Sequence, residues 1–197
     1  MRGLLIAFEG LDQSGKETQV QLLRARLEAE GLRCRTLAFP DYDTFIGQEI
    51  GRALQSQRDY GPDVVQLLFV ANRYEYRRRI TDWLADGHIV LCDRYVASTI
   101  AYGEAQQLDP VWLVEVQRHL PQPDLTIFLD IVPETAARRK AIGRDRYERD
   151  LDLLSRVRAS YLRQAAAPGW HRVDGEHARE TVAAEIATIV AARRARP

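Results

Sequence analysis

The 197-residue sequence has few cysteines, no excess of charge of either sign and no long hydrophobic segment. Its two cysteines, Cys34 and Cys92, lie in apolar runs without CxxC or Cys/His spacing. That pattern argues against a disulfide framework or a zinc site and favours a reducing, cytoplasmic setting. The 28 basic and 28 acidic residues cancel, which argues against a general nucleic-acid binder, because a phosphate backbone demands a cationic surface.

No apolar stretch approaches the roughly 18 to 20 residues that a bilayer span needs. The first apolar run covers only residues 4–8, which is too short for the core of a signal peptide. We therefore expect a soluble, cytoplasmic protein that does not bind membranes. The chain shows no internal repeat, linker or low-complexity segment, so a single domain over residues 1–197 is expected.

Short apolar runs alternate with longer segments of helical spacing. Strands are expected at residues 4–8, 33–39, 88–92, 125–129 and, with a weaker pattern, 171–173. Helices are expected at 16–30, 45–56, 62–86, 96–107, 111–120, from 133 onward, at 150–166 and near the C-terminus. Such alternation predicts an α/β fold in which a parallel sheet of about five strands lies between two layers of helices.

The segment from Gly10 to Lys16 (GLDQSGK) follows the first expected strand and opens the first expected helix. A GxxxxGK pattern in that setting predicts a phosphate-binding P-loop, because glycines let backbone N–H groups turn toward one phosphate and the helix N-terminus adds positive potential. The fold is therefore expected to be of the P-loop NTPase type. The expected phosphate contacts are Gly10, Leu11, Asp12, Gln13, Ser14, Gly15, Lys16, Glu17 and Thr18. The chain lacks the Asn-Lys-x-Asp pattern of a GTPase.

The residue after Lys16 is Glu17 rather than the serine or threonine that normally ligates Mg²⁺ in a P-loop, and Thr18 comes one place late. Glu17 could give Mg²⁺ an oxygen ligand or be a solvent-facing carboxylate that favours the helix dipole. Asp93 follows the expected strand 88–92, where a carboxylate lies at the ligand crevice or caps a helix. Asp93 and Glu17 are the candidate metal ligands.

Four segments resemble the thymidylate kinase family of P-loop nucleoside monophosphate kinases. They are residues 8–16 (FEGLDQSGK), 68–73 (LFVANR), 93–102 (DRYVASTIAY) and 123–130 (PDLTIFLD). The third, DRY-x-x-S-x-x-AY, is the most diagnostic, and the resemblance extends over essentially the full length. It implies transfer of the γ-phosphate of ATP to dTMP, which gives dTDP and ADP for dTTP synthesis, with Mg²⁺ as cofactor and a homodimer as the assembly.

The resemblance also implies an acceptor site. Phe69 would stack on the thymine ring, while Arg73, one helical turn later, and Arg94 would hold the acceptor phosphate from two sides. Taken alone, Phe69 would more often be a core residue and Arg73 would normally be a solvated charge. The other expected dTMP contacts are Asp12 at the sugar and phosphate, Phe39 and Pro40 as a wall, Ser98 and Thr99 along the base, Tyr102 under the deoxyribose, and Tyr147.

Six of the twelve residues from 138 to 149 are basic. Such a run is either a solvated helix face or, at this place in a P-loop kinase, a mobile lid over about residues 138–150. Gln13 stands where some family members carry an arginine, so the catalytic arginine should come from the lid. Arg146 is the first candidate, Arg144 the second, and Arg139 a further one. The expected catalytic set is Lys16, Arg94, Arg146, Arg144 and Asp12.

Two alternatives remain open at the level of sequence. A nucleoside kinase would need a carboxylate base to take the proton of a sugar hydroxyl, and Glu9, just before the loop, could supply it. The second alternative is a regulatory nucleotide-binding protein with weak catalysis, which is suggested by Glu17 in place of the usual hydroxyl residue. Paired Arg73 and Arg94 argue against the first, and Lys16 with Asp93 argues against the second.

Overall fold

The computed structural model describes residues 3–140, 145, 147–148 and 150–195. Within them, five strands form one parallel sheet in the order β2-β3-β1-β4-β5. The strands are β1 (Leu4–Glu9), β2 (Cys34–Ala38), β3 (Ile89–Asp93), β4 (Leu125–Asp130) and β5 (Trp170–Asp174). All five were expected from the apolar runs, and the parallel α/β fold is confirmed.

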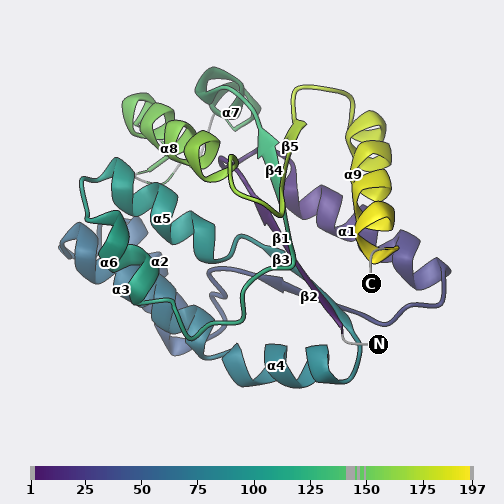
Figure 1. The fold of residues 1–197 in the computed structure, drawn as a ribbon. Helices are drawn as coiled ribbons and strands as arrows, with labels where there is room; N and C mark the ends of the chain where they lie inside the picture. The colour runs from purple at the N-terminus through teal and green to yellow at the C-terminus, as the bar shows by residue number, and fades with distance from the viewer. Residues whose placement is uncertain (1–2, 141–144, 146, 149, 196–197) are drawn as a thin grey trace.

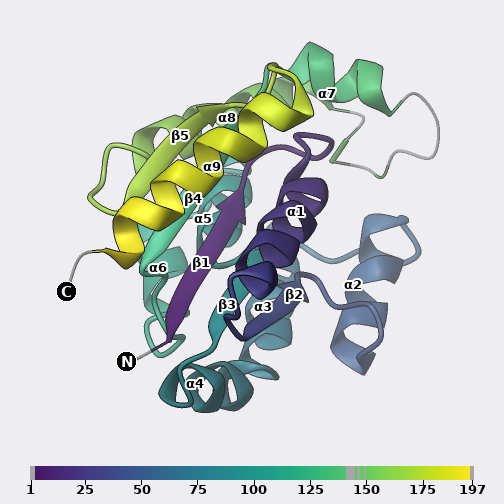
Figure 2. The same cartoon turned by 90° about the vertical axis from the view of Figure 1, so that its right-hand side faces the viewer.

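Helices cover both faces of this sheet. They are α1 (Lys16–Ala29), α2 (Phe45–Leu54), α3 (Pro62–Tyr74), α4 (Arg77–Ala85), α5 (Val96–Ala105), α6 (Pro110–Glu115), α7 (Pro133–Arg139), α8 (Leu151–Gln164) and α9 (Arg179–Arg194). Helices α1 and α9 lie side by side against one face, while α5 and α8 lie against the other (Figures 1 and 2). None of the described helices is long and apolar enough to cross a membrane.

Both faces of the central strand β1 are buried, which explains its continuous apolar run. Ile6 and Phe8 pack in the cluster formed with α1 and α9. Leu5 and Ala7 point to the opposite face and pack with residues of α4. A one-residue shift in register would move each of these side chains to the opposite face of the sheet. In the observed register Phe8 pairs with Asp93 of β3, so the carboxyl ends of β1 and β3 lie side by side.

The single long helix expected from Pro62 to residue 86 is wrong. Helix α3 ends at Tyr74 and α4 begins at Arg77. The Tyr76 amide donates to the carbonyl of Arg73 across a tight turn (3.1 Å), and the Tyr76 hydroxyl bonds the carboxylate of Asp41. This contact with a distant loop redirects the chain, which local helical periodicity does not reveal.

The helix expected over residues 111–120 is also shorter than predicted, because α6 ends at Glu115. Beyond it the amide of Arg118 donates to the carbonyl of Glu115 and that of Leu120 to the carbonyl of Gln117, at 3.2 and 2.9 Å. These are i to i+3 turns rather than α-helical bonds. They bring Leu120, which is 2% exposed, into the core below β1 and β3.

Candidate active site

The phosphate loop runs from the end of β1 to the first turn of α1. Gly10 has φ 141°, and a Cβ there would lie 2.4 Å from the carbonyl oxygen of Leu129 on β4. Gly15 has φ 94° at the N-cap of α1. Both positions therefore require glycine, one for space and conformation and the other for conformation alone. The loop is pressed against the sheet, and its backbone leads directly into a helix N-terminus.

Lys16 is buried at the start of α1, where its ammonium group closes the loop on itself. The Nζ atom donates to the carbonyl oxygens of Leu11 (2.8 Å) and Gly10 (3.3 Å). Burial lowers the pKa of Lys16, and the nearby Arg94 cation lowers it further, while Asp93 opposes both. A bound phosphate would offer this ammonium stronger, charged acceptors than the two carbonyls.

A wide cavity, here called the loop cavity, opens in front of the phosphate loop. Its lining includes Gly15, Lys16, Glu17, Thr18 and Asp93. Glu17 and Thr18 are exposed on the first turn of α1, and Asp93 is half-buried at the end of β3. No group of three or more His, Cys, Asp or Glu side chains gathers as a metal cluster within the described residues.

A second cavity, here called the acceptor pocket, lies between α3, α5 and the loop after β2. All ten predicted dTMP contacts line it. They are Asp12, Phe39, Pro40, Phe69, Arg73, Arg94, Ser98, Thr99, Tyr102 and Tyr147. Tyr42, Leu54, Gln66 and Asp145 complete the lining. The family resemblance thus named residues that the fold brings together from distant segments.

The two cavities share a wall, and Asp12 and Arg94 are the charged residues in it; the other residues that line both cavities are Phe39, Pro40 and Tyr42. The Arg94 Nη2 atom donates to Asp12 Oδ1 (2.7 Å) and to the Tyr102 hydroxyl (3.2 Å), and that hydroxyl donates to Asp12 Oδ2 (3.1 Å). Burial would raise the pKa of Asp12, but the Arg94 and Lys16 cations together hold it well below its usual range. Asp12 is therefore an anion at neutral pH.

Arg94 has a left-handed backbone, with φ 63°. Its amide donates to the carbonyl oxygen of Phe8 on the neighbouring strand (2.8 Å). This bond holds the sharp turn between β3 and α5, in a conformation that is costly for a residue with a Cβ. The turn directs the guanidinium back over the phosphate loop, where it lies above the Tyr102 ring at 5.2 Å.

Helix α3 presents Phe69 and Arg73 to the acceptor pocket. Arg73 is only 1% exposed, so it is not a solvated charge. Its Nη1 atom bonds the Thr99 hydroxyl and its guanidinium lies 5.9 Å from the Phe39 ring. Its Nε has no hydrogen-bond partner in the described part of the chain. Burial lowers the pKa of Arg73 to about 10, so it remains a cation with a donor to spare.

Glu9 is fully buried and its carboxylate is occupied by protein donors. Oε1 accepts from the Tyr95 amide (2.8 Å), and Oε2 accepts from the hydroxyls of Ser98 (2.6 Å) and Tyr161 (3.0 Å). Glu9 is not among the described residues that line the acceptor pocket. A base for a nucleoside hydroxyl would need access to the acceptor, so the arrangement disfavours the nucleoside kinase alternative.

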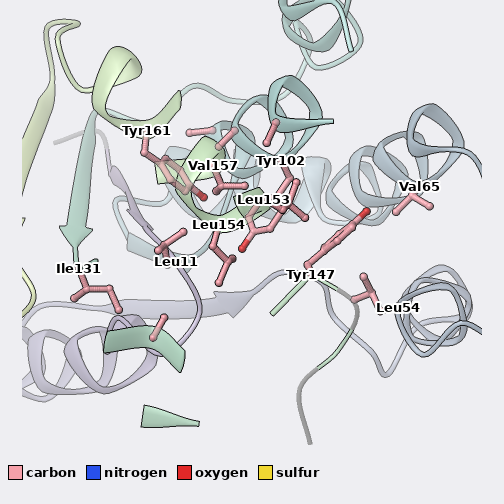
Figure 3. Packing of buried hydrophobic residues seen from close by; sticks show 14 of the residues in the cluster. Leu11, Leu54, Val65, Tyr102, Ile131, Tyr147, Leu153, Leu154, Val157 and Tyr161 are labelled. Carbon is pink, nitrogen blue, oxygen red and sulfur yellow. The ribbon is translucent and has the colours of Figure 1, made fainter. Parts of the chain in front are cut away.

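The basic segment after β4 is described only in part. Arg139, at the end of α7, donates to the carbonyl oxygens of Gln13 (3.0 Å) and Gly175 (2.9 Å), so it joins the phosphate loop to the turn after β5. Tyr147 packs against Tyr102 with ring centroids 5.5 Å apart (Figure 3), and both side chains line the acceptor pocket. Arg144, Arg146 and Arg149 lie outside the described residues.

The sequence analysis missed five residues of this region, one of which is Leu54 at the end of α2. Tyr42, Gln66 and Asp145 line the acceptor pocket, and Tyr161 reaches Arg94 from α8. Tyr42 and Asp145 lie in connecting segments without a regular pattern. Gln66 lies one turn before Phe69 on α3, so the helical spacing contained a signal for it. Tyr161 is spaced with Leu154 and Val157 like an ordinary core residue.

Comparison with known proteins places these features in one family. The family model described as thymidylate kinase matches residues 8–186. Among similar proteins, the thymidylate kinase of Dictyostelium discoideum is 34% identical over 189 residues, 95% of this chain and 85% of that protein. That of Schizosaccharomyces pombe is 40% identical over 162 residues, 82% of this chain and 77% of that protein.

The fold comparison agrees with the sequence comparison. A solved thymidylate kinase structure from Candida albicans superposes with a TM-score of 0.84 at 31% identity, covering 98% of this chain and 93% of that one. The match therefore includes both cavities and the segments that connect them, rather than the sheet alone. Taken with the phosphate loop and the acceptor pocket, these matches show that the chain belongs to the thymidylate kinase family.

Proposed function

We propose that the chain transfers the γ-phosphate of ATP to dTMP, giving dTDP and ADP. The observation that carries this proposal is that the acceptor pocket and the loop cavity share a wall whose charged residues are Asp12 and Arg94. A donor phosphate on the loop and an acceptor phosphate in the pocket would therefore meet beside Asp12 and Arg94. That arrangement suits direct transfer between two bound nucleotides.

The acceptor pocket supplies groups for each part of dTMP. Phe69 gives the thymine ring an aromatic face, and Ser98 and Thr99 offer hydroxyls to the polar edge of the base. Tyr102, which is 7% exposed and fixed by its bond to Asp12, restricts space beside the sugar. Arg73 and Arg94 are buried cations that match a phosphate. Phe39 and Pro40 would close the remaining side.

Transfer needs charge neutralisation more than proton transfer, because the acceptor phosphate is already an anion. Its oxygen forms the new bond to the γ-phosphorus while the bond to the β–γ bridging oxygen breaks, and ADP leaves with that electron pair. Lys16, Arg94 and the lid arginines would neutralise the charge that spreads over the phosphoryl oxygens. Arg146 and then Arg144 stay the lid candidates, and Asp12 orients Arg94.

We also propose that Mg²⁺ serves as cofactor, with Asp93 and Glu17 as its candidate protein ligands. Mg²⁺ typically takes one or two carboxylates and otherwise phosphate and water oxygens. Two carboxylates on the edge of the loop cavity, beside a buried lysine, fit that requirement, and a cluster of three ligands is not needed. The ion would supply Lewis-acid stabilisation of the transferred phosphoryl group.

The proposal also includes a single domain with a mobile lid over about residues 138–150. We further propose that the chain assembles as a homodimer. Four aliphatic side chains that are 40 to 73% exposed support a protein interface, Val64 and Leu67 on α3 and Val111 and Val114 on α6. Exposed apolar side chains that gather in a patch are typical of interaction surfaces. Sedimentation equilibrium tests the dimer, and a monomer at micromolar concentration would refute it.

The function is tested by ADP release from ATP and Mg²⁺ with dTMP, dUMP, dCMP, dAMP, dGMP and thymidine offered separately. Strong turnover with dTMP and little with thymidine is expected. Turnover with thymidine but not dTMP would favour the nucleoside kinase alternative and refute the roles of Arg73 and Arg94. ATP binding without turnover on any acceptor would favour the regulatory alternative based on Glu17.

A further inference from the structure

Tyr161, on helix α8, places a buried hydroxyl beside the arginine at the junction of the two cavities. The residue is 0% exposed. Its Oη atom lies 3.3 Å from Arg94 Nη1, 2.9 Å from Ser98 Oγ and 3.0 Å from Glu9 Oε2. Nothing in the phosphate loop or the family segments of the sequence points to this residue, which comes from the helix that follows the lid region.

Two hydroxyls bridge the Arg94 guanidinium to the Glu9 carboxylate in parallel. Arg94 Nη1 donates to Ser98 Oγ (3.1 Å) and to Tyr161 Oη (3.3 Å), and each hydroxyl donates to Glu9 Oε2, at 2.6 and 3.0 Å. Asp12 holds the other terminal nitrogen, Nη2. The guanidinium is therefore anchored at both ends, by a carboxylate directly and by a second carboxylate through hydroxyls.

The Tyr161 hydroxyl is suited to this relay because it stays protonated. Burial raises the pKa of the phenol, and the Glu9 anion raises it further. The ring is held independently of the hydroxyl, since it stacks on Phe128 with centroids 5.3 Å apart and an interplanar angle of 26° (Figure 3 shows its place in the core). Removing the oxygen alone therefore leaves the packing in place.

We propose that Tyr161 is a positioning residue for the acceptor phosphate, acting through Arg94. The inference rests on the proposed function, in which Arg94 holds that phosphate. Because the tyrosine belongs to α8, the helix after the 138–150 segment has a direct hydrogen bond to the residue that binds the acceptor. The orientation of the guanidinium is thus tied to the position of α8 as well as to the phosphate loop.

The test is Tyr161→Phe, with binding of dTMP and of thymidine measured separately by titration calorimetry. Thymidine lacks the phosphate, so a residue that acts through Arg94 on the phosphate should affect only dTMP. We expect dTMP binding to weaken about fivefold, which corresponds to about 1 kcal/mol, and thymidine binding to change less than twofold. In turnover assays, the KM for dTMP should rise while the KM for ATP stays within twofold.

Tyr95→Phe is the matched control. Tyr95 is also 0% exposed, but its hydroxyl has no hydrogen-bond partner within the described residues. The control removes a buried phenolic oxygen close to the same site and should leave both dissociation constants unchanged. A difference between the two variants isolates the hydrogen-bonded hydroxyl from the general effect of losing a buried polar atom.

A double-mutant cycle with Arg94→Lys decides whether the effect passes through Arg94. If it does, adding Tyr161→Phe to Arg94→Lys should weaken dTMP binding less than twofold further. The proposal is overturned if Tyr161→Phe leaves dTMP binding unchanged, if dTMP and thymidine weaken alike, or if its effect persists in full in Arg94→Lys. Failure of the unmodified protein to bind dTMP would instead refute the proposed function.

Discussion

Replacing Arg94 by methionine should abolish most of the preference for a phosphorylated acceptor. The arginine side chain is only 12% exposed, and methionine reproduces its unbranched stem but not the guanidinium, so the packing around the stem is largely kept. What disappears is the cation that contacts Asp12 at 2.7 Å. Two losses follow for a bound phosphate, namely the missing guanidinium and the Asp12 carboxylate that is no longer neutralised.

Both losses act in the same direction, so the expected effect is large. A hydrogen bond to a charged group contributes about 1.5 to 3 kcal/mol, and a guanidinium binds a phosphate with up to two of them. Repulsion from the unmasked Asp12 adds to this. A total of roughly 4 kcal/mol corresponds to about a thousandfold fall in kcat/KM for dTMP.

A coupled assay of ADP release measures this fall, and thymidine binding by calorimetry provides the control that should not move. Adding Asp12→Asn to Arg94→Met should recover part of the dTMP binding, because it removes the carboxylate that the arginine no longer masks. A value of kcat/KM within threefold of that of the unmodified enzyme would refute the role of Arg94. Equal loss of thymidine binding would show that the variant damages the pocket as a whole.

Other substitutions test the phosphate loop, the carboxyl end of β4 and the surface of α2. Lys16→Met should lower kcat by about 100- to 1,000-fold without lowering the Tm, since it replaces a buried ammonium whose hydrogen bonds within the described residues go to two carbonyls. Asp130→Asn should cost roughly 2 to 3 kcal/mol, a fall in Tm of about 4 to 12 °C by calorimetry, because this 3%-exposed carboxylate accepts from two arginines. A hydrogen bond from Tyr60, with help from Arg58, lowers the pKa of Glu49 to about 2, so its contribution to stability is complete above about pH 4.5 and is lost as the pH falls toward 2. NMR titration should find that low pKa, and Tyr60→Phe should raise it.

Local sequence was sufficient for the sheet and for the phosphate loop. The apolar runs that became β1, β3 and β4 are buried on both faces, so their identity does not depend on finer tertiary detail. The phosphate loop was equally local, since Gly10, Gly15 and Lys16 lie within seven residues and each has a conformational or charge requirement visible in the sequence. Here a local pattern and the three-dimensional role coincide.

The residues of the acceptor pocket were predicted from the family resemblance, because local sequence patterns do not show that they lie together. Phe69 and Arg73 are separated by one helical turn, but Tyr102 lies on another helix and Phe39 on the loop after β2. No periodicity relates these segments. Only the order of the matched motifs predicted that they meet, and the geometry shows that the fold brings them into one cavity.

The features that escaped prediction depend on contacts between distant residues. The break between α3 and α4 follows from the bond of Tyr76 to Asp41, 35 residues earlier. Tyr161 lies 152 residues from its partner Glu9. Its spacing on α8 is that of a core residue, because the aromatic ring does pack in the core. The hydroxyl finds its partner only when α8 packs over the end of β1. A side chain with both an apolar and a polar function is therefore assigned from sequence by its apolar part.

Lys16 and Arg94, two of the cations beside the phosphate loop, both have hydrogen-bond partners within the protein, and this has a consequence for selectivity. Lys16 bonds loop carbonyls and Arg94 bonds Asp12, so a ligand must replace a carbonyl at Lys16 and share the guanidinium with Asp12 at Arg94. A neutral ligand gains nothing from the exchange, whereas a phosphate replaces a carbonyl with an anion at Lys16 and adds a second anion at Arg94. The internal bonds thus favour charged ligands over neutral ones of the same shape. Discrimination between dTMP and thymidine then depends on how firmly Arg94 is held, which is the quantity that Asp12, Ser98 and Tyr161 control.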